Sequence, residues 1–279
     1  MSQNIKLESR LKRDGYSIID FLNLEEIHDL RTIFDQYHLN NQSIEKYLIE
    51  QGMLFSNIYP DNDYKEKITK ILCEYLSFKA EKILDNYELI NSVFIIKTCG
   101  YGQFDYHQDW NMVDEIKHRA YNVWVPLQDV NQKNGTIKLI PGSHNFFPKL
   151  LRSPSTPWID IDTDIRRKLD EKSKIINLKV GEAVIFDSAM IHATTRNVTQ
   201  KNRISILFGI KPFKSRLLHY YYHSGSQKFE CIEISKSYFY DSNYLRTLNC
   251  LKPDGKSLKF IPQEKKMLDK SNLLRKLNL

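Results

Sequence analysis

The 279-residue chain is predicted to be an α+β protein with one main β-sheet system. Two observations lead to this prediction. Apolar residues recur with the helical period of 3.6 in much of the first 88 residues, and from Leu89 onward they alternate with a period of two. Short alternating segments separated by glycine and proline turns are typical of a barrel or a sandwich. Helices therefore come first along the chain, and strands follow.

The N-terminal part shows clear helix boundaries. Gly15 is a natural stop for a preceding helix, because glycine tolerates the backbone conformation that follows a last helical turn. Asn23 is a good N-cap, and Glu25 and Glu26 place negative charge in the first turn of the helix that follows. The predicted elements are a helix over 5–14, a strand over 16–22, a helix over 24–37, an irregular region with short helical pieces over 40–62, and a helix over 63–87.

The second part is predicted to be mainly β, with a charged helix or loop over 160–174 inserted over the sheet. From Pro212 the chain is rich in aromatic residues and is expected to fold back on the sheet as helices and turns. A helical end over 268–279 has an alternative role as a partner-binding or dimer element. The predicted strands cover residues 92–98, 105–110, 120–127, 136–140, 174–180, 183–186 and 203–210.

The bulk composition predicts a soluble cytoplasmic protein. No apolar run approaches the roughly 18 residues of a membrane span, and the N-terminus lacks a signal peptide's apolar region. The four cysteines are scattered, which favours free thiols over a disulfide framework or a zinc ribbon. The formal net charge is +7, and residues 211–279 alone carry 14 Lys/Arg against 6 Asp/Glu. This excess is typical of a solvated tail, or of a surface that steers an anionic substrate or an acidic carrier protein.

A candidate metal site lies in the segment 106–110, Tyr-His-Gln-Asp-Trp. On an extended chain His107 and Asp109 emerge on the same side, and together they supply two thirds of a 2-His-1-carboxylate facial triad. The third ligand must come from a distant position. His192 is the best candidate, because it follows an apolar segment that is typical of a strand ending at a cavity.

Several segments together resemble the phytanoyl-CoA dioxygenase (PhyH-like) family of non-haem iron, 2-oxoglutarate-dependent oxygenases. The similarity covers roughly residues 8–212, and the tail is outside it. The block Asn-Gly-Thr-Ile-Lys-Leu-Ile-Pro-Gly-Ser-His over 134–144 is the most specific part when combined with the three candidate ligands. The other matching segments are 14–22, 94–97, 106–110, 122–127 and 181–192, with Arg203 following.

The resemblance implies a double-stranded β-helix, the jelly-roll or cupin-like fold, with N-terminal helices packed on the sheet and a helical or irregular C-terminal extension. It also implies Fe(II) as cofactor, with 2-oxoglutarate and O2 as co-substrates. The chain 1–279 is then one domain, divided into a helical part (1–88), a jelly-roll core (89–212) and an extension (213–279). The implied site residues are His107, Asp109 and His192 for iron, Arg203 and Thr194 for the distal carboxylate of 2-oxoglutarate, and Trp124 and Lys97 near that co-substrate.

The implied activity is hydroxylation of an unactivated C–H bond in a small-molecule or carrier-bound substrate, in secondary or lipid metabolism. Related halogenases carry a small residue where this chain has Asp109, so hydroxylation is favoured over halogenation. Desaturation and ring formation use the same kind of site and stay open. Two alternatives from other classes are a non-catalytic metal-binding sensor and a cupin-like zinc or manganese isomerase. No nucleic-acid-binding motif and no membrane span are found in the sequence, and the oligomeric state stays open.

Several further residues have competing interpretations. His144 belongs to the Pro-Gly-Ser-His turn and is expected to be structural. Arg196 is the rival of Arg203, but it lies four residues after His192, in a predicted turn. The residues expected to line a substrate pocket are Tyr101, Tyr106, Gln108 and Trp110.

Overall fold

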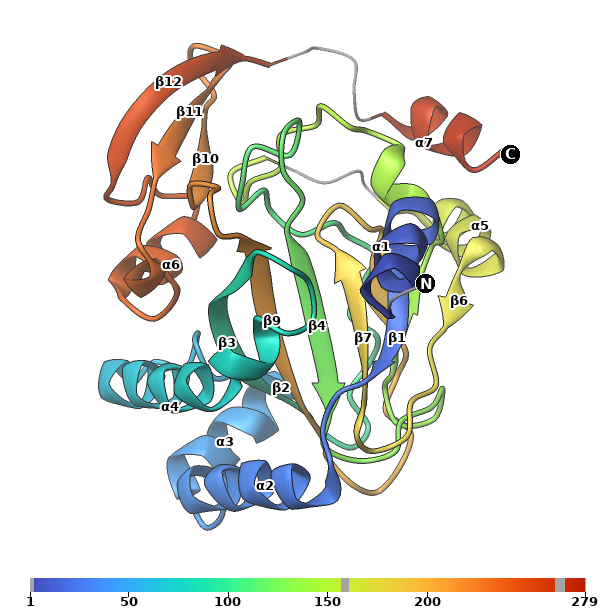
Figure 1. Cartoon of the computed structure of the whole chain (residues 1–279), viewed down its shortest axis with the longest axis vertical. Helices are drawn as coiled ribbons and strands as arrows, with labels where there is room; N and C mark the ends of the chain where they lie inside the picture. The colour runs from blue at the N-terminus through green and yellow to red at the C-terminus, as the bar shows by residue number, and fades with distance from the viewer. Residues whose placement is uncertain (1–2, 157–160, 264–268, 279) are drawn as a thin grey trace.

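The computed structural model describes residues 3–156, 161–263 and 269–278, and it confirms an α+β protein with antiparallel sheets. Figure 1 shows the helices α2, α3 and α4 grouped beside the largest sheet, with a separate small sheet near the C-terminal end. The helices are α1 (Gln3–Asp14), α2 (Leu24–His38), α3 (Gln42–Gln51), α4 (Asn62–Ala80), α5 (Thr163–Lys172), α6 (Ser242–Leu248) and α7 (Lys270–Lys276).

The strands form three sheets with the orders β1-β7-β4-β9-β3-β2, β6-β5-β8 and β10-β11-β12. All the described pairings within them are antiparallel. The strands are β1 (Tyr16–Asp20), β2 (Met53–Phe55), β3 (Tyr87–Lys97), β4 (Tyr121–Pro126), β5 (Ile137–Leu139), β6 (Lys174–Ile175), β7 (Glu182–Asp187), β8 (His192–Thr194), β9 (Arg203–Pro212), β10 (Leu218–His223), β11 (Lys228–Glu233) and β12 (Lys256–Pro262).

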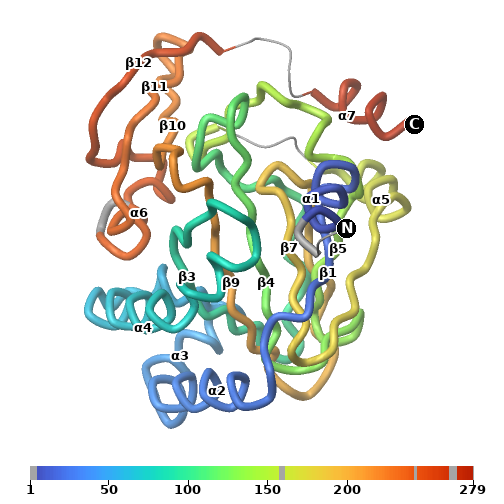
Figure 2. The backbone as a smooth tube through the Cα atoms, in the orientation of Figure 1, coloured from blue at the N-terminus to red at the C-terminus, as the bar shows by residue number. Residues whose placement is uncertain are grey.

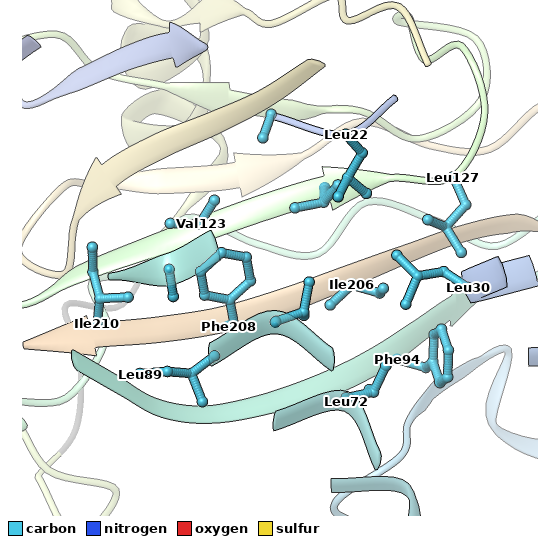
Figure 3. Packing of buried hydrophobic residues seen from close by; sticks show 14 of the residues in the cluster. Leu22, Leu30, Leu72, Leu89, Phe94, Val123, Leu127, Ile206, Phe208 and Ile210 are labelled. Atoms are coloured by element: carbon cyan, nitrogen blue, oxygen red, sulfur yellow. The ribbon is translucent and has the colours of Figure 1, made fainter. Parts of the chain in front are cut away.

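The two faces of the six-stranded sheet have different roles. On one face, Phe94 of β3 and Ile206 of β9 pair in register and pack with Leu30 of α2 and Leu72 of α4 in the main apolar core. Figure 3 shows these side chains between the strands and the helices. Because side chains alternate along a strand, the neighbouring residues point to the opposite face. That second face, which includes Trp124, lies toward the sheet β6-β5-β8.

The start of the chain follows the predicted pattern closely. Asn23 and Glu26 form a capping box at the N-terminus of α2, which satisfies two otherwise unpaired backbone N–H groups. Gly15 ends α1 with a φ of +83°. A Cβ atom at this position would lie 2.2 Å from the Met190 sulfur and 2.5 Å from Nδ1 of His144, so only glycine fits. His144 itself lies against α1, with Nε2 3.2 Å from the Lys12 carbonyl oxygen, which agrees with a structural role.

Several predicted boundaries are wrong. Residues 105–110 do not form a strand, because only His107 pairs, in a single bridge. The predicted helix over 63–87 ends at Ala80, and turns lead through Asn86, with a φ of +63°, into β3. Apolar residues continue with helical spacing past Ala80, which explains the error. His192 begins β8 instead of ending a strand, and the strand predicted over 174–180 is reduced to β6.

The region 40–62 is more regular than predicted, since it contains α3 and β2. The charged segment over 160–174 forms α5, although Asp160 lies outside the described residues. β2 adds an edge strand to the main sheet, beside β3.

The prediction that the extension consists of helices and turns is wrong in one respect, because it also contains the sheet β10-β11-β12. The signal was a hairpin pattern: two segments rich in β-forming residues, β10 and β11, are separated by the turn sequence Ser-Gly-Ser-Gln. The terminal helix α7 packs on α5, with Leu273 and Leu277 buried beside Ile165 and Leu169. The apolar face of α7 is therefore covered within the chain, and Leu268 and Leu279 lie outside the described residues.

Figure 2 follows the backbone from end to end and shows α1, α5 and α7 on the same side of the molecule in this view. None of the helices in the described ranges combines the length and the apolar character that crossing a bilayer requires.

Candidate metal centre and its cavity

Three side chains from distant parts of the chain converge on one point. His107, Asp109 and His192 each offer a ligand atom, and these atoms lie within 4.8 Å of one another. Nε2 of His107 is 3.8 Å from Oδ1 of Asp109, and Nε2 of His192 is 3.7 Å from Oδ2. Two imidazole nitrogens and one carboxylate at this separation form the donor set of a facial triad.

Backbone pairing brings the two histidines together. His107 and His192 exchange two backbone hydrogen bonds, of 3.0 and 2.9 Å, in an antiparallel bridge. Asp109 continues this contact, because its backbone N–H donates to the Ser188 carbonyl at 3.0 Å. The chain around 107–109 is therefore extended, as predicted. It does not count as a strand, because its pairing is limited to a single bridge.

The second nitrogen of each histidine fixes its tautomer. Nδ1 of His107 is 2.8 Å from the Asp105 carbonyl oxygen, and Nδ1 of His192 is 3.0 Å from the Met190 carbonyl oxygen. A carbonyl oxygen only accepts, so Nδ1 carries the hydrogen and the Nε2 lone pair is free to bind a metal. Burial, and then the neighbouring His192, lower the pKa of His107 to about 4, which keeps this imidazole neutral.

Asn122 of β4 orients the carboxylate. Its Nδ2 donates a 2.6 Å hydrogen bond to Oδ2 of Asp109. Oδ2, the oxygen closer to His192, is thereby held, and Oδ1 lies on the side of His107. Outer contacts of this kind commonly set the orientation of a metal ligand.

Two buried cations lie side by side on the same face of the main sheet. Lys97 of β3 and Arg203 of β9 are register partners, and they are 0% and 1% exposed. Burial, followed by the charge of Arg203, lowers the pKa of Lys97 to about 7. Burial also lowers the pKa of Arg203, and its Nε is buried with no hydrogen-bond partner among the described residues.

The remaining predicted residues surround this cation pair. Thr194 accepts hydrogen bonds at Oγ1 from Nζ of Lys97, at 2.8 Å, and from the Phe104 backbone, at 3.0 Å. The Trp124 ring lies 5.2 Å from the Arg203 guanidinium carbon. The fold therefore brings together the four residues that were predicted near the co-substrate: Lys97, Trp124, Thr194 and Arg203. Arg196 is different, since it is exposed and its Nε is 3.4 Å from the Gly100 carbonyl oxygen.

Ser205 is a positioning residue that the sequence reasoning missed. Its Oγ accepts a hydrogen bond from Nη1 of Arg203 and another, of 3.0 Å, from Nε1 of Trp124. Asn122 was missed in the same way. A signal existed in both cases, because Ser205 lies two residues after Arg203 and Asn122 lies two residues before Trp124. Residues two apart share a face of a strand.

The three candidate ligands and Arg203 line one cavity of about 490 Å³, called here the inner cavity. Most of its remaining wall is apolar and comes from the main sheet. Phe239, Tyr244 and Leu248 of the extension also line it. Gln108 and Trp110 are on its wall, as predicted, whereas Tyr101 is not and instead lies 5.7 Å from Nζ of Lys97.

Comparison with known proteins decides the family. The sequence profile of the family phytanoyl-CoA dioxygenase (PhyH) matches residues 11–205, which is more than half of the chain. The chain belongs to the PhyH family. A curated relative from Danio rerio, phytanoyl-CoA dioxygenase domain-containing protein 1, is 31% identical over 146 residues, which are 47% of this chain and 49% of the relative. This PhyH chain thus spans about half the length of that relative.

Solved structures share the fold of this PhyH protein at low sequence identity. The carbocyclase SnoK from nogalamycin biosynthesis, described as non-heme and alpha-ketoglutarate-dependent, has a TM-score of 0.53 and 14% identity, over 94% of this chain and 96% of SnoK. The non-heme monooxygenase ThoJ, solved with nickel, has a TM-score of 0.52 and 16% identity, over 96% of this chain and 92% of ThoJ. At these identities the similarity establishes a jelly-roll-like fold and nothing about the reaction.

Proposed function

We propose that this PhyH-family protein is a non-haem Fe(II)- and 2-oxoglutarate-dependent dioxygenase that hydroxylates a C–H bond of a small-molecule or carrier-bound substrate. One observation carries the proposal: a two-histidine, one-carboxylate donor set lines the same cavity as a buried arginine that has no carboxylate partner among the residues that the structure describes. A facial triad leaves coordination positions free for a co-substrate. A guanidinium is suited to bind a carboxylate with two parallel hydrogen bonds.

The residues present fit Fe(II). Two imidazoles can present Nε2 lone pairs to a metal, because their Nδ1 atoms donate to backbone carbonyls. Asp109 adds a negative charge and is oriented by Asn122. Bound at this site, iron would supply the reaction with O2 activation and the oxidising power to break a C–H bond.

The residues also fit 2-oxoglutarate. An unpaired, buried guanidinium nitrogen is costly unless a ligand satisfies it, and Nε of Arg203 is in this state. A dicarboxylate would meet Arg203 and Lys97 as counter-charges, and it would favour the protonated form of Lys97. The Thr194 hydroxyl already accepts two hydrogen bonds, so its own hydrogen is free to be donated to a carboxylate.

The cavity wall supports selectivity for one C–H bond. Apolar side chains such as Val93, Phe186 and Leu207 line the space around the triad. Ser205 holds Arg203 and Trp124 in one arrangement, so a bound co-substrate would keep a constant position relative to the triad. Orientation of this kind is the protein's own contribution to catalysis by a bound cofactor.

Three measurements test the proposal. Anaerobic protein with Fe(II) should develop a weak visible charge-transfer band when 2-oxoglutarate is added. In a separate assay with O2 present, candidate substrates should stimulate succinate formation. Absence of the band would contradict the proposal and favour a zinc or manganese isomerase, to be checked by metal analysis. A band without substrate-stimulated succinate, across a broad substrate panel, would favour a sensor.

The type of oxidation needs a separate measurement, since one similar structure is described as a carbocyclase. Hydroxylation transfers one oxygen atom from O2 into the product, whereas ring closure and desaturation add none. Mass spectrometry of the product formed under ¹⁸O2 should therefore show an added heavy oxygen. A product without the heavy oxygen would indicate ring closure or desaturation instead of hydroxylation.

A further inference from the structure

A second cavity of about 690 Å³, called here the outer cavity, adjoins the inner one. The two share a wall made of Phe104, His107, Gln108 and Trp110. His107 is a candidate metal ligand, so the outer cavity lies directly against one residue of the metal centre. A ligand that extends from one cavity into the other would pass directly beside the triad.

The C-terminal extension supplies much of the outer wall. Tyr220, Tyr222 and Phe229 of the hairpin β10-β11 and Ile261 of β12 line the outer cavity. These side chains present a mostly aromatic surface, and Trp110 is also on the wall of this cavity. The profile of the PhyH family ends at residue 205, so this wall belongs to a part of the chain that the family match does not cover.

The extension is attached to the segment that carries the triad. The Leu218 backbone N–H donates to the Met112 carbonyl at 2.9 Å, three residues after Asp109. The Tyr222 backbone N–H donates to Oγ of Ser155 at 3.0 Å, in the loop that forms another part of the outer wall. The wall is therefore held in place by hydrogen bonds at both sides.

The wall of the outer cavity carries three carboxylates and three cations, and a positive excess appears when two ion-pair partners outside the wall, Arg166 and Lys117, are counted as well. Its three carboxylates each have a cationic partner: Asp105 lies 2.6 Å from Arg166, Glu115 lies 2.6 Å from Arg152, and Asp114 lies 3.7 Å from Lys117. Lys149 and Lys259 are exposed on the wall, and within residues 3–156, 161–263 and 269–278 neither has a carboxylate within ion-pair distance. An anionic ligand group would find both cations available.

We propose that the outer cavity is the substrate-recognition part of the site, and that the substrate is an elongated molecule with an apolar or aromatic body and an anionic group. The body lies between Trp110 and the aromatic wall of the extension. The anionic group pairs with Lys149 and Lys259, and the reacting carbon extends past His107 into the inner cavity. The placement of the reacting carbon rests on the proposed function. The recognition of the aromatic body and the anionic group rests on the outer cavity alone.

The test uses two fluorescent probes with the full chain. 8-Anilinonaphthalene-1-sulfonate has an aromatic body and one sulfonate, and N-phenyl-1-naphthylamine has a similar body without charge. We expect saturable binding of both. The double variant Lys149→Gln/Lys259→Gln should weaken sulfonate binding about fivefold or more and leave the neutral probe unchanged. Lys256→Gln is the matched control, because Lys256 is also an exposed lysine of β12 but is not on the cavity wall.

A second variant locates the probes. Tyr222→Ser removes part of the aromatic wall and should weaken both probes. The proposal would be overturned if the sulfonate probe failed to bind saturably, if the double lysine variant bound it with unchanged affinity, or if Lys256→Gln weakened it equally. Far-UV circular dichroism checks that each variant is folded.

The same protein samples separate this inference from the proposed function. The Fe(II)–2-oxoglutarate band should be unchanged in Lys149→Gln/Lys259→Gln, since both lysines lie outside the inner cavity. In the unmodified protein, an intact band without saturable binding of the sulfonate probe would reject the recognition cavity alone. A missing band in the unmodified protein would reject the proposed function, whereas the probe results would still decide whether the outer cavity binds anions.

Discussion

Lys97 and Arg203 lie directly opposite each other on the paired strands β3 and β9, and both side chains are buried. Like charges side by side in a sheet are unfavourable. Lys97 compensates partly by donating to Thr194 and to the Thr195 carbonyl, but no carboxylate among the described residues forms an ion pair with either cation. A dianionic ligand bound beside Lys97 and Arg203 would neutralise both charges and so remove this unfavourable interaction.

The first prediction concerns the pH dependence of 2-oxoglutarate binding. Because the pKa of Lys97 is lowered to about 7, ligand-free protein loses this positive charge as the pH rises above 7. Binding a dianion restores the charge, so binding takes up a proton. The dissociation constant of 2-oxoglutarate should therefore increase between pH 7 and 9, approaching about tenfold per pH unit. Titration of the Fe(II) chelate band measures it, and Lys97→Met should bind more weakly with a flatter pH profile. An equally steep profile in Lys97→Met would exclude Lys97 as the titrating group.

The same shift predicts an effect on stability. The folded-state pKa of Lys97, about 7, is below the ordinary value of 10.5, so the unfolded chain binds more protons between these two values. The contribution of Lys97 to the free energy of unfolding is therefore most unfavourable below pH 7, and it improves as the pH rises toward 10.5. Ligand-free Lys97→Met should be more stable than the parent protein at pH 7, in chemical denaturation. The difference should shrink at pH 10, and a difference that grew would contradict the assignment.

The third prediction separates the two arginines near the site. Arg203→Ala should raise the KM for 2-oxoglutarate about 10- to 100-fold, because a hydrogen-bonded charge pair is lost. Arg196→Ala is the matched control, since Arg196 is exposed and is not on the inner cavity wall. Succinate formation at increasing 2-oxoglutarate concentration measures both. If the KM of Arg203→Ala for 2-oxoglutarate were unchanged, Arg196 or Lys97 would be the residue that binds the carboxylate.

The fourth prediction concerns the carboxylate ligand and its partner. Asp109→Ala should abolish Fe(II) binding at this site and hydroxylation. Asn122→Ala should lower metal affinity by about 10- to 100-fold, because it removes the hydrogen bond that orients Asp109. Calorimetric titration with Fe(II) under anaerobic conditions measures both affinities. The control is Asp105→Ala, whose carboxylate pairs with Arg166 outside the triad. Full activity of Asp109→Ala would refute the triad.

The fifth prediction concerns a buried ion pair behind the metal centre. Nε of Arg152 donates a 2.6 Å hydrogen bond to the Asp109 carbonyl, and Nη2 lies 2.6 Å from Oε1 of Glu115. Arg152→Gln leaves Glu115 as an unpaired buried carboxylate and should lower the free energy of unfolding by about 3–5 kcal/mol. Arg152→Gln/Glu115→Gln should recover part of that loss, because no isolated charge is left. Urea denaturation measures both, and a double variant less stable than the single one would argue against this origin.

Local features of the fold could be predicted because they depend on residues close together in the chain. The N-cap at Asn23, the stop at Gly15 and the period-two pattern of β3, β4 and β9 were all visible in the sequence. The errors arose where local signals conflict with the fold. Apolar residues after Ala80 keep helical spacing although the chain turns there, and the hairpin pattern of the extension was overlooked.

The sequence by itself determined the α+β class and the donor types at 107 and 109, because alternation along an extended segment is a property of neighbouring residues. The tertiary structure alone decided which distant groups meet. The bridge between His107 and His192, the pairing of Lys97 with Arg203 and the attachment of β10 beside Met112 depend on which segments pair across the sheets. The physical reason is that such pairing depends on burial and backbone hydrogen bonding over the whole chain, and no short stretch of sequence records it.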